Sequence, residues 1–230
     1  MPDAPLAIDV FSDVVCPWCF IGKRRLEKAI ALVSDIPVEV HWRPFFLNPW
    51  VPPEGMARAE YLTAKFGSVE RYRSIAQRVA AAAKDEGLVY ALDKIARQPN
   101  TRDCHRLIRW AERVGAGGRM KQRLMELYFT EGADLSDREV LVRAAIDCGL
   151  GADVRERLAS DSDIAEVEAE AEAAKNAGID GVPCFILGGV LAVSGAQSPD
   201  DLADAIRRAS AEVARRAHGA ATAAAPLPAK

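Results

Sequence analysis

Hydrophobic and polar positions alternate near the start of the chain and then change to a helical period. Leu6, Ile8 and Val10 stand at every second position, which predicts a buried β-strand. From residue 20 to residue 33 the apolar positions recur every three or four residues, which predicts a helix. Residues 36–43 alternate again, with a polar side chain at every second position, as expected for a strand at a sheet edge. The strand–helix–strand order predicts that the two strands run parallel.

The middle of the chain has a helical pattern from about residue 56 to residue 161. A loop with four prolines, residues 44–55, separates it from the second strand. Ser136 and Glu139 have the spacing of a capping box ahead of an apolar helical series. No fixed repeat is visible, so this block is predicted to be one helical insertion.

Strands return towards the C-terminus, and the last helix has a clear start signal. Ser198 is predicted to be its N-cap and Pro199 its first residue, with Gly219 as a C-terminal stop. The predicted elements are, in order, a helix over 162–177, a strand over 181–187, a hairpin turn at Gly188-Gly189, a strand over 190–193 and a helix over 199–216.

The composition is that of an ordinary globular protein. The chain has 230 residues, of which 50% are hydrophobic and 27% charged, and its formal net charge is -3. The near-balanced charge gives no electrostatic reason to expect nucleic acid or an anionic membrane as a partner. The first five residues lack the basic and apolar regions of a signal peptide, and no stretch approaches the length of a membrane span. We therefore expect a cytoplasmic protein.

The strand-to-helix junction carries the chemistry of greatest interest, the Cys16-Pro17-Trp18-Cys19 motif. Cys16 is predicted at or near the helix N-cap, where first-turn N–H groups and the helix dipole stabilise a thiolate and lower the thiol pKa. Cys19 lies one turn further and is expected to be better buried. The pair is therefore predicted to exchange disulfides, with Cys16 as nucleophile and Cys19 as resolving thiol.

Two other interpretations of the cysteine pair were weighed. A zinc site usually needs four ligands, yet Cys104, Cys148 and Cys184 are isolated and the chain has only three histidines. An inert core pair is disfavoured by the strand-to-helix context. No metal site is therefore predicted, and the roles of the three isolated cysteines stay open.

Several further motifs, read together with the cysteine motif, resemble one family. They are Asp13 to Gly22, Arg43 to Pro49, Pro99-Asn100-Thr101 with His105, Tyr128 to Gly132, Gly181-Val182-Pro183 and Ser194 to Gln197. Together they resemble the FrnE-type proteins of the DsbA-like thioredoxin superfamily. The same superfamily includes 2-hydroxychromene-2-carboxylate isomerases and kappa-class glutathione transferases, which typically carry Ser where this chain has Cys16.

The element order agrees with the fold that this resemblance implies. We predict an α/β protein with a thioredoxin fold, βαβ…αββα, interrupted by an all-helical insertion domain. Residues 1–50 and 162–218 are predicted to form the thioredoxin-like domain and residues 51–161 the insertion. Residues 219–230, rich in Ala and Pro, are predicted to be disordered.

The resemblance also implies roles for residues outside the cysteine pair. Pro183 is expected to be the cis proline that faces the cysteines, which leaves the Val182 backbone free to pair with an extended substrate. Asp13, three residues before Cys16, is a candidate for tuning the thiolate, although it could simply cap a turn. The residues expected to look towards the cleft are Asn48, Asn100, Thr101 and His105; of these, Thr101 could equally be a helix N-cap and His105 an ordinary core residue.

The leading interpretation is a protein disulfide oxidoreductase of the DsbA type that needs no cofactor beyond the Cys16–Cys19 couple. Trp18 is expected to cover the disulfide and contact substrate, with plain surface packing as the alternative. Expected partners are protein or small-molecule thiols and disulfides, with glutathione as a candidate co-substrate or a thioredoxin-type protein as reductant. Either a monomer or a homodimer is compatible with the sequence. The alternatives are a glutathione-dependent isomerase or transferase and a non-catalytic chaperone that binds clients in the cleft.

Overall fold

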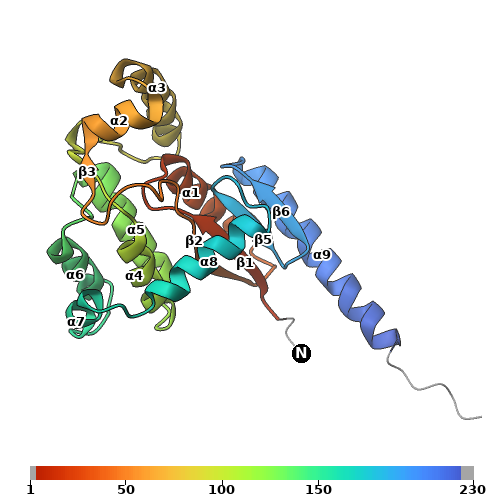
Figure 1. The fold of residues 1–230 in the computed structure, drawn as a ribbon. Helices are drawn as coiled ribbons and strands as arrows, with labels where there is room; N and C mark the ends of the chain where they lie inside the picture. The colour runs from red at the N-terminus through yellow and green to blue at the C-terminus, as the bar shows by residue number, and fades with distance from the viewer. Residues whose placement is uncertain (1–3, 224–230) are drawn as a thin grey trace, which may run out of the picture.

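A four-stranded sheet forms the centre of the molecule (Figure 1). The computed structural model describes residues 4–223, with side chains described as far as residue 218. The strands lie in the order β2-β1-β5-β6. They are β1 (Leu6–Ser12), β2 (Val38–Pro44), β5 (Cys184–Leu187) and β6 (Leu191–Ser194).

Strand β1 follows the predicted alternation, since every second residue from Leu6 to Ser12 is buried. Helix α1 (Pro17–Leu32) connects β1 to β2, and the two strands run parallel, with Leu6 opposite Val38. Strand β2 is at the sheet edge, as its half-polar pattern predicted. On its other side β1 pairs antiparallel with β5, which in turn pairs antiparallel with β6.

Helices cover both faces of the sheet (Figure 1). Helix α1 and the last helix α9 (Pro199–Ala223) pack together, and their apolar residues form one core with β1 and β5. Helix α8 (Ile164–Asn176) lies across the front of the strands in the view of Figure 1 and contacts β2. The predicted thioredoxin-like α/β fold is confirmed.

The long segment between β2 and α8 is mostly helical. The prediction that it is helical throughout is wrong, because it also contains two short strands. Met56–Ala57 (β3) pairs antiparallel with Arg97–Gln98 (β4), and irregular chain surrounds them. Strands of two residues are too short to show an alternation of hydrophobic and polar positions in the sequence. The helices are α2 (Arg58–Phe66), α3 (Val69–Asp85), α4 (Arg102–Glu112), α5 (Gly117–Glu126), α6 (Arg138–Asp147) and α7 (Val154–Ala159), with a 3-10 turn over Leu92–Lys94 and a π-helical turn over Leu127–Glu131.

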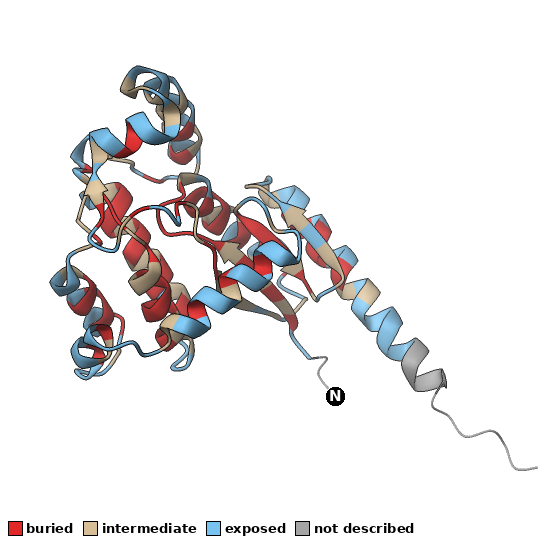
Figure 2. Cartoon of the chain, viewed as in Figure 1, coloured by how far each residue is buried: buried red, intermediate tan, exposed pale blue. Residues whose placement is uncertain are grey.

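The largest hydrophobic core joins this segment to the first turns of α1 (Figure 2). Phe20 of α1 lies 5.9 Å from Tyr90 and 6.1 Å from Phe129, measured between ring centroids. The hydroxyl of Tyr90 also donates a hydrogen bond to the carbonyl of Pro17, at 2.7 Å. The insertion is therefore packed directly against the start of α1. The limits of the two domains at residues 51 and 161 stay a prediction.

Two predicted helix starts are wrong by one or two residues. Helix α6 is capped by Asp137, whose carboxylate accepts the Glu139 N–H at 2.8 Å, and not by Ser136. The capping box fails because the Ser136 side chain is turned into a buried site beside Gly55. Helix α8 begins after Asp163, which has a left-handed backbone with φ 57°, so Ser162 lies outside the helix.

The C-terminal signals are partly confirmed. Ser198 accepts the Asp201 N–H at 3.1 Å as the N-cap of α9, and Gly188 and Gly189 both have positive φ, as the predicted hairpin turn requires. The end of α9 was predicted wrongly, because the helix continues through Gly219 to Ala223. Flanking alanines have the highest helix propensity, which accounts for the continuation through one glycine. The rest of the predicted disordered tail, residues 224–230, lies outside the described residues.

Candidate active site

The junction between β1 and α1 places Cys16 at the N-cap of the helix. Its backbone is extended, with φ -88° and ψ 113°, and Pro17 is the first helical residue, as predicted. The carbonyl of Cys16 accepts the backbone N–H of Cys19 at 3.0 Å. The Cys16 thiol itself donates a long hydrogen bond to the carbonyl of Val182, at 3.7 Å. The sulfur therefore lies between the start of α1 and the loop that precedes β5.

The two thiols of the motif have opposite pKa shifts. A hydrogen bond from the Cys19 thiol, supported by the N–H groups of Cys19 and Trp18, lowers the pKa of Cys16 against the opposing effect of burial. Burial raises the pKa of Cys19 well above its usual value, and the hydrogen bond to Cys16 adds to the increase. Both shifts favour negative charge on Cys16, at the helix N-terminus, over negative charge on Cys19.

The Val182-Pro183 peptide bond is cis and lies beside the cysteine motif. Gly22 of α1 allows this close approach, because a Cβ atom at Gly22 would lie 2.8 Å from Cγ of Pro183. That distance is shorter than packed carbon atoms adopt, so any side chain at Gly22 would push the loop away from the helix.

A cavity of about 300 Å³ opens over Cys16. Trp18, which is 39% exposed, and Val182 form part of its rim. Most of the remaining wall comes from α2 and α3 of the insertion. That wall is apolar at Ile75 and Val79 and carries two cations, Arg58 and Lys65. A molecule bound here would contact the Cys16 sulfur and the insertion together.

A buried polar cluster lies close to the same cysteines. Asp13, His105 and Lys121 are all buried, and they come from the end of β1, from α4 and from α5. One oxygen of Asp13 accepts the Leu47 N–H at 2.8 Å, whereas the other lies 3.5 Å from Nε2 of His105 and has no hydrogen bond. The Lys121 ammonium donates to the carbonyl of Ser12 at 3.1 Å.

Charges within this cluster shift its pKa values and those of the cysteines. Burial alone would raise the pKa of Asp13, but His105, the Leu47 N–H and Lys121 lower it below its usual value. Burial lowers the pKa values of His105 and Lys121. Lys121 in turn acts to lower the pKa of Cys19, and Asp13 acts to raise that of Cys16. The cluster is therefore electrostatically connected to both thiols.

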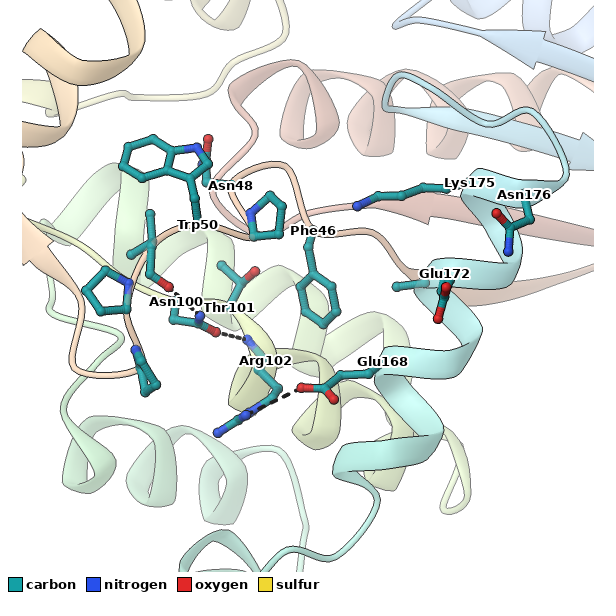
Figure 3. Close-up of a pocket in the computed structure, with 15 residues that line it drawn as sticks. Phe46, Asn48, Trp50, Asn100, Thr101, Arg102, Glu168, Glu172, Lys175 and Asn176 are labelled. Carbon is teal, nitrogen blue, oxygen red and sulfur yellow. Dashed lines mark hydrogen bonds and ion pairs between the residues drawn. The ribbon is translucent and has the colours of Figure 1, made fainter.

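Three of the predicted substrate contacts line a different pocket. Asn48, Asn100 and Thr101 lie around a hollow of about 720 Å³ between the proline-rich loop, α4 and α8 (Figure 3). Asn48 stands in the wall between the two pockets, since its side-chain oxygen accepts hydrogen bonds from Tyr61 and Lys65. Asn100 Oδ1 accepts the Arg102 N–H at 3.0 Å, at the start of α4. The structure thus brings Trp18 and Val182 to the cavity over Cys16. His105 and Asp13 line neither this cavity nor the hollow of Figure 3, and they lie together in the protein interior.

Three site residues were missed from the sequence. Lys121 carried a usable signal, because it falls on the same helix face as Gly117 and Leu124, where an apolar residue is expected. Arg58 and Lys65 are seven residues apart and therefore share a face of α2. That spacing alone is common in surface helices, so only the tertiary packing of α2 over Cys16 distinguishes them.

The described residues include no evident metal site. No group of three or more His, Cys, Asp or Glu side chains within the described part of the chain is arranged to hold a metal ion. The three isolated cysteines, Cys104, Cys148 and Cys184, are buried. None of the helices over residues 4–223 is long and apolar enough to cross a membrane.

Comparison with known proteins agrees with this geometry. The model of the DSBA-like thioredoxin domain matches residues 7–207. The chain belongs to this family. A probable DsbA oxidoreductase from Streptomyces coelicolor is 32% identical, with a TM-score of 0.83 over 98% of this chain and 94% of that chain. The predicted membership of the DsbA-like thioredoxin superfamily is thus confirmed, and with it a thiol–disulfide oxidoreductase type of enzyme.

Two more distant structures share the fold. The cytosolic disulfide reductase DsbM from Pseudomonas aeruginosa, solved with GSH, is 20% identical, with a TM-score of 0.60 over 88% of this chain and 98% of that chain. A 2-hydroxychromene-2-carboxylate isomerase is 13% identical, with a TM-score of 0.62 over 95% of this chain and 100% of that chain. The DsbA-like fold is therefore common to reductases and isomerases, and the particular reaction must be argued from the site.

Proposed function

We propose that the protein is a thiol:disulfide oxidoreductase that works through its Cys16–Cys19 couple. The observation that carries this proposal is the placement of the two thiols, with Cys16 at the N-cap of α1 beside a cavity and Cys19 one turn further into the helix. Cys16, with its lowered pKa, borders an open cavity, whereas Cys19, with its raised pKa, is held one turn below. A stabilised thiolate beside a protonated second thiol is the arrangement that stepwise disulfide exchange requires.

The reaction on a substrate disulfide has two steps. The Cys16 thiolate attacks one substrate sulfur, which forms a mixed disulfide and releases the other sulfur as a thiolate. Cys19 then loses its proton and attacks the Cys16 sulfur, which breaks the mixed disulfide and releases the second substrate thiolate. Two electrons pass from the cysteine pair to the substrate, and both released thiolates take up protons. The reverse sequence oxidises a substrate dithiol.

The residues around the pair would assist these steps without reacting. The positive charge of Lys121 opposes the high pKa of Cys19 and so favours the second step. The buried Asp13–His105 contact has unused hydrogen-bonding capacity, and the Asp13 charge acts on the pKa of Cys16, so this pair would tune the thiolate. The carbonyl of Val182, now bonded to the Cys16 thiol, would be exposed to the backbone of an extended substrate, with Pro183 holding the loop in place.

The finer identity that we propose is a FrnE-type protein acting in the cytoplasm, with glutathione or a thioredoxin-type protein as the physiological thiol. Asn48, Asn100 and Thr101 would contact the more distant part of a protein substrate, through the hollow of Figure 3. A glutathione-dependent isomerase or transferase is less well supported, because it needs only one activated position and gives Cys19 no role. A chaperone would need neither cysteine.

The decisive experiment is reduction of insulin by the purified chain in the presence of a thiol donor. Cys16→Ser should abolish the activity, and Cys19→Ser should accumulate a mixed disulfide that survives acid quenching and is seen by mass spectrometry. Cys148→Ser is the matched control, since Cys148 lies outside the cysteine motif and away from the cavity. Full activity of the Cys16→Ser variant would overturn the proposal.

A further inference from the structure

Two cations in the wall of the Cys16 cavity have no carboxylate partner. The Arg58 guanidinium donates only to neutral groups: to the side-chain oxygen of Gln98 at 2.6 Å and to the hydroxyls of Tyr128 and Tyr72, each at 3.0 Å. Its Nε atom is buried and has no hydrogen-bond partner. The Lys65 ammonium donates to the side-chain oxygen of Asn48, which is also neutral. Within residues 4–218, neither side chain forms an ion pair.

Two other partly buried arginines of this protein are paired differently from Arg58. Arg25 contacts Glu86 at 2.6 Å, and Arg43 contacts Asp9 at the same distance. Each of these arginines therefore has a carboxylate within direct hydrogen-bonding distance. Arg58 lines the cavity and its charge is balanced by no carboxylate among the described residues, so an anion that enters the cavity could supply the missing counter-charge.

The same cavity offers an apolar surface next to these cations. Ile75, Val79, Leu92 and Phe129 line it, and the sulfur of Cys16 borders it. Arg58 and Lys65 both lie over the ring of Tyr61, at 5.1 Å and 5.7 Å from its centroid, so both charges are close to one residue of the cavity wall. A volume of about 300 Å³ is at the small end of ligand pockets and fits a small molecule better than a folded segment.

We propose that Arg58 and Lys65 bind the carboxylate of a small disulfide or thiol whose sulfur reacts with Cys16. This inference rests on the proposed function and adds the substrate class. The carboxylate would pair with the two cations, the apolar or aromatic body of the molecule would lie against α3, and its sulfur would face Cys16. The reaction is the two-step exchange written above, in which two electrons pass from the reduced cysteine pair to the substrate disulfide.

The test compares two aromatic disulfides that differ in charge. Dithiobis-nitrobenzoate carries two carboxylates, whereas dithiodipyridine is uncharged at neutral pH, and both release a coloured thiol. The fully reduced protein is mixed with each reagent in a stopped-flow instrument, and the second-order rate constant is measured. Lys65→Gln should slow the carboxylate reagent roughly ten-fold, the scale of one charge-assisted hydrogen bond, and leave dithiodipyridine unchanged.

Matched variants separate the subsite from a general change of charge. Lys84→Gln removes one positive charge from an exposed position at the end of α3, outside the cavity, and should leave both rate constants unchanged. Arg58→Gln should act in the same direction as Lys65→Gln, and Arg58→Lys should recover part of the loss. If Arg58→Gln does not fold, the exposed Lys65 still tests the subsite. Equal slowing of both reagents by Lys65→Gln, or no slowing of either, would overturn it.

Two further measurements distinguish failure of the carboxylate subsite from failure of the proposed function. A disulfide-linked peptide rich in glutamate should react equally with the wild type and Lys65→Gln, and a ten-fold loss with the peptide would overturn the assignment to a small molecule. If the wild type reacts with neither reagent, or Cys16→Ser reacts as fast as the wild type, the proposed function itself is wrong. Rapid reaction of the wild type with both reagents, without discrimination by Lys65→Gln, leaves that function intact and removes only the subsite.

Discussion

Two carboxylates, Asp163 and Asp13, contact helix α4 near its two ends, and they accept very different numbers of hydrogen bonds. Asp163 accepts hydrogen bonds from Trp110 at 2.7 Å, from Arg109 at 3.1 Å and from Arg113 at 2.6 Å. Asp13, at the other end of α4, has one backbone donor, and its second oxygen stands 3.5 Å from His105 without a hydrogen bond. The saturated carboxylate fastens α4 to α8. The unsaturated one lies beside the thiols, where unused capacity can serve chemistry.

The largest expected effect is the loss of stability when Asp13 is removed. Asp13→Ala leaves the Leu47 N–H without its acceptor and removes one of the negative charges that favour the ionised form of the fully buried Lys121. Breaking a buried charge arrangement of this kind costs about 3–5 kcal/mol. Urea denaturation followed by circular dichroism measures the change in the free energy of unfolding. Asp13→Asn, which keeps an acceptor, should cost less, and equal costs for the two variants would contradict this account.

Removing Asp163 should have a smaller effect, confined to stability. Asp163→Asn keeps the shape of the side chain but weakens charge-assisted hydrogen bonds to partly exposed arginines, which should cost roughly 1–3 kcal/mol. The rate at which iodoacetamide alkylates Cys16 should not change, because Asp163 contacts neither thiol. A change in that rate would show that the two ends of α4 are coupled, and the contrast drawn above would then be wrong.

The contribution of Asp163 should also disappear in acid. Burial opposes ionisation, yet the hydrogen bonds from Arg113, Trp110 and Arg109 lower the pKa of Asp163 from 3.8 to about 2. A carboxyl whose pKa is lower in the folded state stabilises the protein above its unfolded pKa, and this contribution is lost as the pH falls through the folded value. The stability difference between wild type and Asp163→Asn should therefore shrink between pH 4 and pH 2. A difference that stays constant over this range would refute the assignment.

The smallest expected effects are those on thiol reactivity, and they should have opposite directions. Asp13→Asn removes a charge that raises the pKa of Cys16, so alkylation of Cys16 at mildly acidic pH should become a few-fold faster. Lys121→Met removes a charge that lowers the pKa of Cys19, so decay of the mixed disulfide should slow by a similar factor. Arg119→Met, on an exposed position of the same helix, is the control. Changes of the same sign in both variants would argue against an electrostatic cause.

The parts of the fold that follow from local patterns could be predicted from the sequence. The alternation of β1, the edge position of β2, the glycine turn after β5 and the Ser198 cap all depend on neighbouring residues. The same holds for Cys16 at the N-cap before Pro17, which the short-range order of strand, cysteine and proline specifies. The errors have equally definite causes. The β3–β4 pairing joins residues about forty positions apart and is only two residues long, so no local periodicity reports it.

The position of Cys16 in the candidate site was predictable from the sequence, but the residues that surround it were not. Lys121 reaches the cysteines only because α5 packs against the end of β1, more than a hundred residues earlier in the chain. Asn48 and Asn100 were expected in the cleft, yet the path of the proline-rich loop directs them into a second hollow. Both outcomes depend on how the insertion packs on the sheet, and a single sequence gives no measure of that packing.

The cavity over Cys16 is built mainly from two stretches of chain that are far apart in the sequence. Its reactive atom comes from the β1–α1 junction, and much of its wall comes from residues 58–79. Substitutions in that second stretch alter which molecules reach the sulfur while the N-cap, the cis proline loop and the buried carboxylate stay as they are. Exchange of α2 and α3 should therefore change which molecules reach Cys16 without altering the cysteine motif itself.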